Sequence, residues 1–376
     1  MFIDHSISFY IFHIRRNYSV RLPIISAALG TLVLASTLAG CGSSTPSAAG
    51  NGAHTISPVL DVGNFAAYLP HEILHQFENK YHVHINYSTY PSNAELLAKM
   101  QAGQEFDVAV ASDYMVQTMT KLGLLDKLNF KDIPNFKNIA PPFRNLPFDP
   151  HSEYSVPYLW GTVPIAVNTH AVHVPVTGYR SLLNPVFKNN LVVVDSPRTM
   201  VGIALMMNGH NLNDTNLSAL NQAAVTLDKF RPQVKVFNSN DPHVDLLNGE
   251  ATAGIVWSGE GALAYSQDPW ILPVYPKSGV NRWFDNFIIP TSSKAKYTAE
   301  LFINFLLSPK ISAELENAEE YSDPNTAADP YIQKSLLKNP WLNPPQWVIT
   351  QGEVMKAIPA SANEQFNTIW EKFKQS

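Results

Sequence analysis

The stretch that decides the class of fold is residues 106–114, which read F-D-V-A-V-A-S-D-Y. Its first six residues are mostly apolar and typical of a buried strand, whereas the residues after it return to helical spacing. The alternation continues outward: we expect a helix at 69–81, a strand at 84–87, a helix at 93–101, this strand at 106–111 and a helix at 114–122. Strands that alternate with helices predict an α/β fold with a mostly parallel sheet.

The rest of the chain continues this pattern. An extended apolar segment at 158–168 is followed by predicted strands at 191–194, 253–257 and 287–290, and by predicted helices at 200–229, at 243–248 and up to Leu307, the last with Thr298 as its N-cap. Glycine and proline cluster in loops and at strand ends rather than in one linker. Since no single boundary divides the chain, we predict two α/β lobes joined by crossing strands.

Composition and charge narrow the classes of function. The chain has 376 residues, enough for two domains with proper cores. Hydrophobic residues make up 45% and charged residues 15%, which is typical of a globular protein rather than a disordered one. The net charge is −5 and no cluster of lysine and arginine recurs along the chain, which argues against nucleic acid as a partner.

The N-terminal segment indicates export. Arg15, Arg16 and Arg21 precede a mostly apolar run at 22–39, the order of a basic and then an apolar region in a signal peptide. The residues before Arg21 look unlike a signal peptide, so we expect translation to begin at Val20. We therefore assign residues 1–40 to a signal peptide.

The end of that segment indicates a lipid anchor. Residues 38–41, L-A-G-C, resemble the lipobox of bacterial lipoproteins, in which the cysteine is lipidated. Cys41 is the only cysteine, so it cannot form a disulfide within the chain. The alternative is a core cysteine behind a true transmembrane helix. Small and polar residues fill 41–54, which we interpret as a flexible, lipid-anchored linker.

One short motif suggests a metal. Residues 71–75, His-Glu-Ile-Leu-His, match H-E-x-x-H, which on a helix places two histidines on one face as zinc proteases require. Glu95 lies downstream, where a third ligand could sit. A structural explanation for the glutamate in this motif is that Glu72, in the first turn, interacts favourably with the helix dipole. A zinc hydrolase using His71, Glu72, His75 and Glu95 remains an alternative.

Aromatic residues recur at the carboxyl ends of predicted strands and in the loops beside them, where ligands bind in open α/β sheets. Ring faces attract a cation, and Asp285, two positions after Trp283, would neutralise it. Core or rim packing explains any one ring alone, but the set predicts a site for an organic cation. The set is Phe65, Tyr68, Ser112, Tyr114, Trp257, Trp283, Asp285 and Tyr321.

Several blocks, in order over roughly residues 56–330, resemble the spermidine/putrescine-binding proteins of bacterial ABC importers. The blocks are 87–95, 106–114, 148–161, 237–240, 254–259, 283–286 and 303–309. The resemblance implies a class II periplasmic-binding fold, in which two lobes close on a small amine ligand. It also implies delivery to an ABC permease, no catalysis, no cofactor and a monomer.

The resemblance also implies lobe bounds and site residues. We expect lobe 1 at 55–158 and 288–376, lobe 2 at 159–287, and hinge strands between them. By position, the implied ligand contacts are Tyr68, Ser112, Tyr114, Trp257, Trp283, Asp285 and Tyr321. Phe65 stands where the family has a tryptophan, which keeps a ring.

Departures from the family leave the ligand open. The family places further carboxylates where this chain has Ala67, Ser196 and Thr199. A ligand with several ammonium groups would lose neutralisation there, and burying an unpaired ammonium is costly. Ser196 and Thr199 could hydrogen-bond a neutral tail instead, and Arg198 could pair with an anionic one. The alternatives are therefore a polyamine-like ligand, a monocation, or an amino-acid-like compound, and the fold could also serve a sensor.

Overall fold

The computed structural model describes residues 55–66 and 68–376. The chain separates into two units, Met1–Ala53 and His54–Ser376, and only the second contains described residues. The predicted signal peptide, Cys41, the linker at 41–54 and Ala67 lie outside the described residues. No helix among the described residues combines the length and the apolarity needed to cross a membrane.

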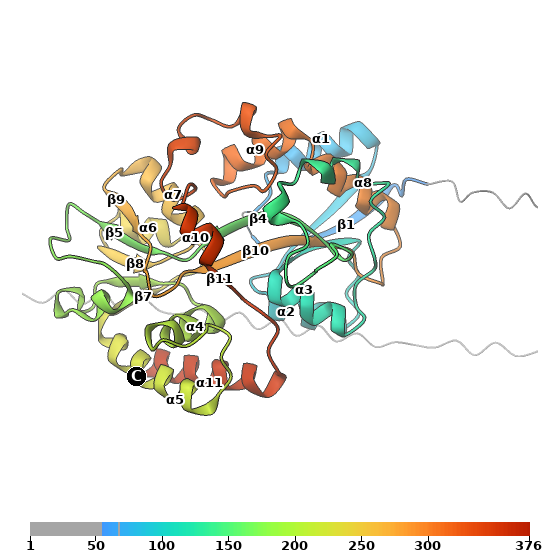
Figure 1. The fold of residues 1–376 in the computed structure, drawn as a ribbon. Helices are drawn as coiled ribbons and strands as arrows, with labels where there is room; N and C mark the ends of the chain where they lie inside the picture. Colours follow the sequence, from blue (N-terminus) through green and yellow to red (C-terminus); the bar gives the residue numbers. More distant parts are fainter. Residues whose placement is uncertain (1–54, 67) are drawn as a thin grey trace, which may run out of the picture. The chain divides into compact units, whose positions relative to one another are not determined.

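The first sheet contains the quoted stretch as its strand β3 (Val108–Ser112). Its strand order is β11-β10-β3-β1-β2, with β4 paired to β10 (Figure 1). The other strands are β1 (Val59–Asn64), β2 (His84–Thr89), β4 (Ser155–Thr162), β10 (Asn281–Ile288) and β11 (Glu353–Val354). Strand β1 is parallel to β2 and β3, whereas β10 is antiparallel to β3 and β4. The accompanying helices are α1 (His71–Tyr81), α2 (Asn93–Gln101), α3 (Asp113–Lys121), α8 (Lys296–Leu306) and α9 (Pro309–Glu319).

The second sheet has the strand order β7-β6-β8-β5-β9. Its strands are β5 (Ile165–Asn168), β6 (Leu191–Val193), β7 (Val234–Phe237), β8 (Ala253–Ile255) and β9 (Ile271–Val274). Its helices are α4 (Pro197–Met207), α5 (Leu217–Phe230), α6 (Pro242–Leu247) and α7 (Ser258–Gln267). The expected single helix at 200–229 is wrong, because Gly209 takes a positive φ of 81° and ends the first of two helices.

Paired strands link the two sheets. The chain leaves the first sheet at Thr162 and enters the second at Ile165, and it returns between Val274 and Asn281. Figure 1 shows β4 and β10 running side by side between the two groups of elements. The mixed α/β architecture with two lobes is therefore confirmed.

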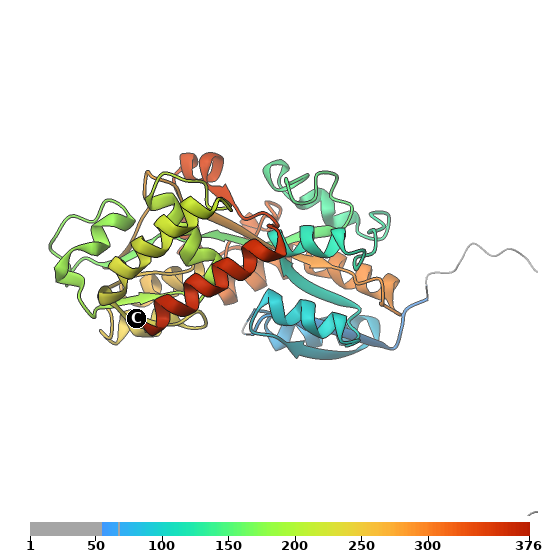
Figure 2. The ribbon, with the colours of Figure 1, turned by 90° about the horizontal axis from the view of Figure 1, so that it is seen from below.

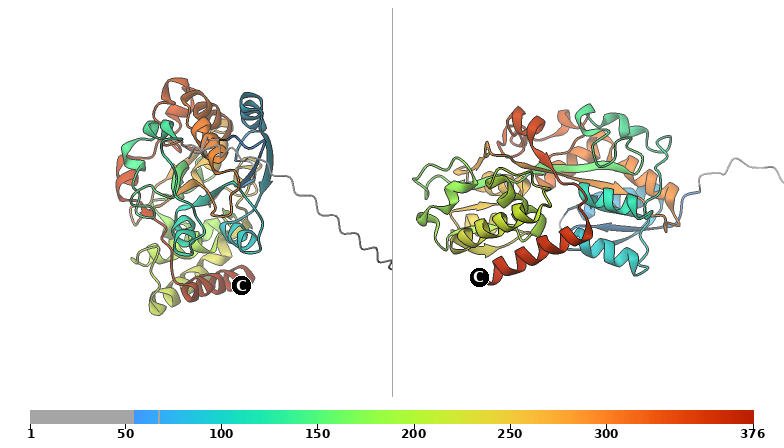
Figure 3. Two further views of the ribbon diagram at one scale, coloured as in Figure 1. Left: turned by 90° about the vertical axis from the view of Figure 1, so that its right-hand side faces the viewer. Right: turned by 60° about the horizontal axis from the view of Figure 1, so that its bottom comes forward.

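The last helix, α11 (Ala360–Gln375), follows the short helix α10 (Gln346–Gln351). It packs against α4 and α5 of the second sheet, although the predicted bounds assign 288–376 to the other lobe. Figures 2 and 3 show it, in red, lying along these helices and ending at the marked C-terminus. Its apolar face is buried, and it carries Trp370, whose indole N–H donates to Asp195 at 2.8 Å.

Short 3-10 helices fill several of the connections. They lie at Pro134–Asn138, Pro141–Phe143, Tyr179–Leu183, Pro185–Phe187, Arg231–Gln233, Asp329–Tyr331 and Leu336–Lys338.

The apolar spacing read from the sequence explains the packing of α1. Ile73, Leu74 and Phe77 are its buried residues, and the Phe77 ring meets Phe302 of α8 edge to face, with 5.0 Å between centroids. The expected cap of α8 is wrong, since its N-cap is Ala295. Thr298 lies inside the helix, where its hydroxyl accepts the Ser57 N–H at 2.7 Å.

The acid in the quoted stretch is structural. The carboxylate of Asp107 accepts the backbone N–H groups of Asp61, Lys294 and Ala295 and the hydroxyl of Ser293, all at 2.9–3.0 Å. It therefore ties β1 and the start of α8 to the edge of β3.

Candidate ligand-binding site

A buried carboxylate lies where β3 and β10 pair. Asp285 of β10 stands opposite Ser112, the last residue of β3. Its Oδ1 accepts the Ser112 hydroxyl at 2.6 Å, and its Oδ2 accepts the Tyr68 hydroxyl at 2.8 Å. Its exposed fraction is 7%, so the carboxylate is buried. Strand β4 pairs with the other edge of β10, with Leu159 opposite Asp285.

Burial sets the charge state of this acid. Desolvation raises the pKa of Asp285 to about 6, although the hydrogen bonds from Ser112 and Tyr68 oppose the shift. Both of these partners are uncharged hydroxyls, so they leave the negative charge unneutralised. An ammonium group placed here would remove that electrostatic penalty.

Aromatic rings from both sheets form one row beside Asp285. Tyr68 lies edge to face with Tyr321 at 5.4 Å between centroids, and Tyr321 meets Trp283 in the same way at 5.6 Å. Trp283 of β10 in turn meets Trp257 at 6.4 Å, just beyond β8 of the second sheet. Phe65 extends the row at the other end, 5.9 Å from Tyr68. The row thus brings together ring residues that the sequence placed at separate strand ends and loops.

The remaining predicted residues lie around the start of α4. Ser196 is the N-cap of this helix: its hydroxyl accepts the Thr199 N–H at 3.4 Å and donates to Thr199 Oγ1 at 3.0 Å. These bonds give Ser196 and Thr199 a structural role, and ligand contact by either residue stays a prediction.

A buried cation lies next to Tyr114, at the start of α3. The Arg198 guanidinium is 5.2 Å from the centroid of the Tyr114 ring and donates to Asn213 Oδ1 at 3.2 Å and to the Lys356 carbonyl at 3.1 Å. Its exposed fraction is 6%, and burial lowers its pKa. Its Nε is buried without a hydrogen-bond partner. This end of the site therefore carries positive charge.

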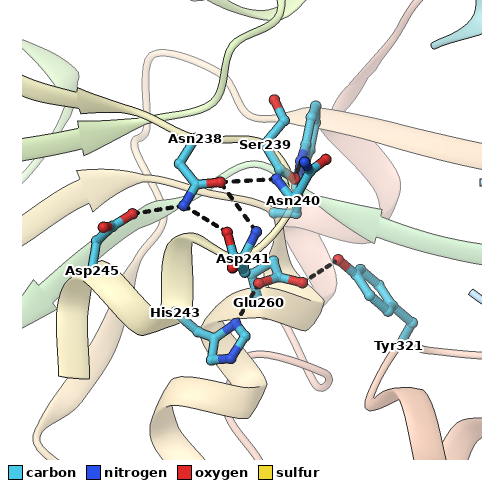
Figure 4. Close-up of polar contacts among 9 residues, drawn as sticks. Asn238, Ser239, Asn240, Asp241, His243, Asp245, Glu260 and Tyr321 are labelled. Carbon is cyan, nitrogen blue, oxygen red and sulfur yellow. Dashed lines mark hydrogen bonds and ion pairs between the residues drawn. The ribbon is translucent and has the colours of Figure 1, made fainter. Parts of the chain in front are cut away.

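A second buried carboxylate, Glu260, was missed by the sequence analysis. It lies in the first turn of α7, three residues after Trp257, and is 6% exposed. Its Oε1 accepts the Tyr321 hydroxyl at 3.3 Å, and its Oε2 lies 2.6 Å from Nδ1 of His243 (Figure 4). The only signal in the sequence was an acid one helical turn from a candidate ring.

Tyr68 and Tyr321 connect the two carboxylates. One hydroxyl donates to Asp285 and the other to Glu260, and their rings are in contact. Burial and the nearby acids raise the pKa of both phenols well above 10.0, so both stay neutral donors. Two anionic groups therefore stand at the two ends of an aromatic pair.

The H-E-x-x-H segment forms no metal site. His75 pairs with Glu78 at 2.9 Å, and Glu95 pairs with Lys99 at 3.2 Å on another helix. Among the described residues, no group of three or more histidine, cysteine, aspartate or glutamate side chains is arranged to hold a metal ion. The zinc-hydrolase alternative thus has no supporting geometry.

Two mixed sheets joined by crossing strands, with rings from both sheets gathered beside a buried acid, define a two-lobed binding protein of the periplasmic-binding class. The profile of the family described as "Bacterial extracellular solute-binding protein" matches residues 72–342. The chain belongs to this family, and the resemblance read from its sequence is confirmed.

Individual relatives agree with this assignment. The chain is 33% identical over 314 residues to the spermidine/putrescine-binding periplasmic protein of Salmonella typhimurium, covering 83% of this chain and 90% of the relative. It is also 33% identical to the protein of that name in Escherichia coli K12, covering 83% and 89%. A solved structure of a putative spermidine/putrescine ABC transporter from Listeria monocytogenes matches with a TM-score of 0.81 and 30% identity, over 85% of this chain and 99% of that one. The TpPotD lipoprotein of Treponema pallidum matches with a TM-score of 0.75 and 27% identity, over 84% and 99%.

Proposed function

We propose that this protein captures a short aliphatic diamine of the polyamine class between its lobes and delivers it to an ABC permease, without catalysis. The observation that carries the proposal is the pair of buried carboxylates, Asp285 and Glu260, at the two ends of the Tyr68–Tyr321 ring pair. Each carboxylate can neutralise one ammonium group, and the ring faces attract the chain between them. The names of the relatives, which include spermidine/putrescine-binding proteins, support the same ligand class.

In this proposal the site comprises the ten predicted residues together with Glu260. One lobe is built on each sheet, with α11 packed on the second, and the lobes rotate about the links at Thr162–Ile165 and Val274–Asn281, as hinges do in domain closure. The protein acts outside the cytoplasm, which agrees with an extracellular family and with periplasmic relatives. We also propose that it acts as a monomer.

A second candidate is an amino-acid-like ligand with one ammonium and one carboxylate. The observation that favours it is the buried Arg198 beside Tyr114, since a guanidinium pairs well with a carboxylate. Three compounds with the same four-carbon chain separate the candidates: butane-1,4-diamine, 4-aminobutanoate and butylamine. Their affinities are measured by calorimetric titration. Tightest binding of the diamine supports the proposal, whereas tightest binding of 4-aminobutanoate supports the second candidate. If none of the three binds, the amine site is wrong.

Replacing Glu260 by glutamine is expected to weaken binding of butane-1,4-diamine about tenfold and to leave butylamine unchanged. The loss stays moderate because His243 already neutralises part of the carboxylate's charge. Glu250→Gln, at an exposed glutamate in the connection between α6 and β8, is the matched control. Equal losses for both amines would place Glu260 outside the ligand contact.

We also propose that Cys41 carries a lipid anchor, as its lipobox-like context indicates. The related TpPotD protein is itself called a lipoprotein. Cys41→Ser is expected to release the protein from membranes or to leave it unprocessed, because the thioether to the lipid cannot form. Membrane fractionation with mass spectrometry of the N-terminus measures this, and full membrane retention of a correctly cleaved variant would contradict it.

A further inference from the structure

His243 and Glu260 form the closest contact between titratable groups near the site. Nδ1 of His243, in the first turn of α6, lies 2.6 Å from Oε2 of Glu260, and their side chains are 21% and 8% exposed. Figure 4 shows the Glu260 carboxylate between the imidazole on one side and the Tyr321 hydroxyl on the other. The Glu260 carboxylate therefore contacts the site residue Tyr321 with one oxygen and His243 with the other.

Hydrogen bonds within the loop before His243 orient this side chain. The side-chain amide of Asn238 donates to Asp241 and to Asp245, both at 2.8 Å, and its oxygen accepts the N–H groups of Asn240 and Asp241. Figure 4 shows this bracket around the start of α6. The two aspartates are thereby engaged by Asn238, and Glu260 is the acid in direct contact with His243.

A neighbouring ring fixes this loop to the site. The Trp257 indole N–H donates to the carbonyl of Ser239 at 3.1 Å, and Trp257 is the last ring of the aromatic row. A change at His243 therefore reaches the site through two routes, by Glu260 to Tyr321 and by the loop to Trp257.

Within the described part of the chain, the charged groups that act on His243 are acids. They are Asp241 before α6, Asp245 in α6, Glu260 in α7, and Glu320 after α9. The hydrogen bond from Glu260 and then the charges of these acids raise the pKa of His243 above 6.5, against the effect of partial burial. The acids therefore favour the imidazolium form of His243.

We propose that His243 is a positioning residue that carries a proton. In the empty protein its imidazolium neutralises Glu260. When the second ammonium of a diamine binds at Glu260, the imidazolium loses its proton and becomes neutral imidazole. The inference rests on the proposed function, since it requires a ligand with two ammonium groups. The balance is simple: the ligand keeps its protons, one proton passes from the ring to solvent, and the carboxylate exchanges one cation for another. Without this release, two cations would compete for one buried carboxylate.

The direction of the pH dependence follows from linkage. Affinity for the diamine rises with pH through the raised pKa of His243, by at most about tenfold per pH unit for one released proton, and levels off above it. Two other acids also contribute. Asp285, with a pKa of about 6, changes the affinity for every amine alike. Glu319 lies beside Glu260, and burial raises its pKa to about 7; its effect on affinity remains when His243 is replaced. The contribution of His243 is therefore the part that is specific to diamines and absent from His243→Asn.

The test is calorimetric titration near pH 7 in buffers of different ionisation enthalpy, with butane-1,4-diamine and butylamine as probes. We expect the wild type to release up to about one more proton with the diamine than with butylamine. His243→Asn keeps a donor at the Nδ1 position but no titrating charge, so it should lose that difference and retain diamine affinity at pH 8. His243→Phe removes the donor and should lower diamine affinity about tenfold at pH 8, with butylamine unchanged.

Each result decides the matter. If the wild type binds both amines and His243→Asn releases as many protons as the wild type, His243 is only structural and the inference is overturned. If the wild type binds neither amine, the proposed function fails and the inference fails with it. Melting curves accompany each titration, and His243→Asn carries the test if His243→Phe does not fold.

Discussion

Replacing Asp285 by asparagine is expected to weaken amine binding by about 30-fold or more, the largest loss among single changes of charge in the site. Removing one partner of a buried charged hydrogen bond costs on the order of 2–5 kcal/mol, and about 1.4 kcal/mol corresponds to tenfold in affinity. Asparagine keeps the shape and one acceptor for Ser112 or Tyr68, so the change isolates the charge. Unlike Glu260→Gln, it should weaken the diamine and butylamine alike, because both place an ammonium at Asp285.

The same variant should not be less stable when empty. The pKa of Asp285 in the folded protein, about 6, is above the ordinary value of 3.8. The ionised group therefore destabilises the fold at neutral pH, and this effect fades as pH falls below 6. Asparagine removes that penalty, which is on the order of 3 kcal/mol at pH 7.5. We therefore expect the melting temperature of the ligand-free variant to be equal to or a few degrees above that of the wild type at pH 7.5, with no such gain at pH 4.

Calorimetric titration and melting curves at both pH values measure these two effects. Asp228→Asn, at an exposed aspartate in α5, is the matched control for loss of a charge. Normal amine binding by Asp285→Asn would show that the carboxylate does not contact the ligand. Unfolding of the variant would instead make Asp285 a structural acid.

The fold followed from local patterns that need no knowledge of distant contacts. The apolar run in residues 106–111 and the helical spacing of Ile73, Leu74 and Phe77 each record which face is buried, and the structure agrees with both. The strand-end argument likewise expected Ser112 and Asp285 to lie close together, and they form a hydrogen bond.

The structure also contains features that no local pattern records. Glu260 and Tyr321 are 61 positions apart, and His243 reaches Glu260 only because a loop bracketed by Asn238 turns α6 toward α7. The buried Asp285 carboxylate is bonded by Ser112 and Tyr68, which lie 173 and 217 positions away in the chain. In both cases long-range packing, not residue type, decides the chemistry.

Gly259→Ala is expected to lower amine affinity on the order of 10- to 100-fold by moving a ring and not a charge. Gly259 lies between Trp257 and Glu260 in the first turn of α7, and a Cβ there would come within 2.2 Å of Cε1 of Tyr321. Tyr321 cannot move freely, since its ring contacts Tyr68 and Trp283 and its hydroxyl donates to Glu260. Overpacking of this kind costs typically 1–3 kcal/mol, which corresponds to about that loss in affinity.

Because of where the clash lies, we expect Gly259→Ala to lower the affinity for the amine and not the stability of the fold. Gly259 lies in helix α7, which packs against β9 of the second sheet. Tyr321 is attached to the first sheet, because the carbonyl of the next residue, Ser322, accepts the Trp160 N–H of β4. If the lobes separate in the empty protein, as we propose, the open form relieves the clash and the closed, ligand-bound form does not. Alanine in place of glycine inside a helix is otherwise favourable by roughly 0.5–1 kcal/mol.

Gly261→Ala is the control with a clash of the same size away from the ligand. A Cβ at Gly261 would lie 2.1 Å from the buried Trp341 ring, so this variant should lose stability and keep its affinity. Titration with butane-1,4-diamine and melting curves of both variants separate the two effects. If Gly259→Ala binds the diamine as the wild type does, the Tyr321 ring is not part of the ligand contact, because no alanine can occupy that position without displacing it.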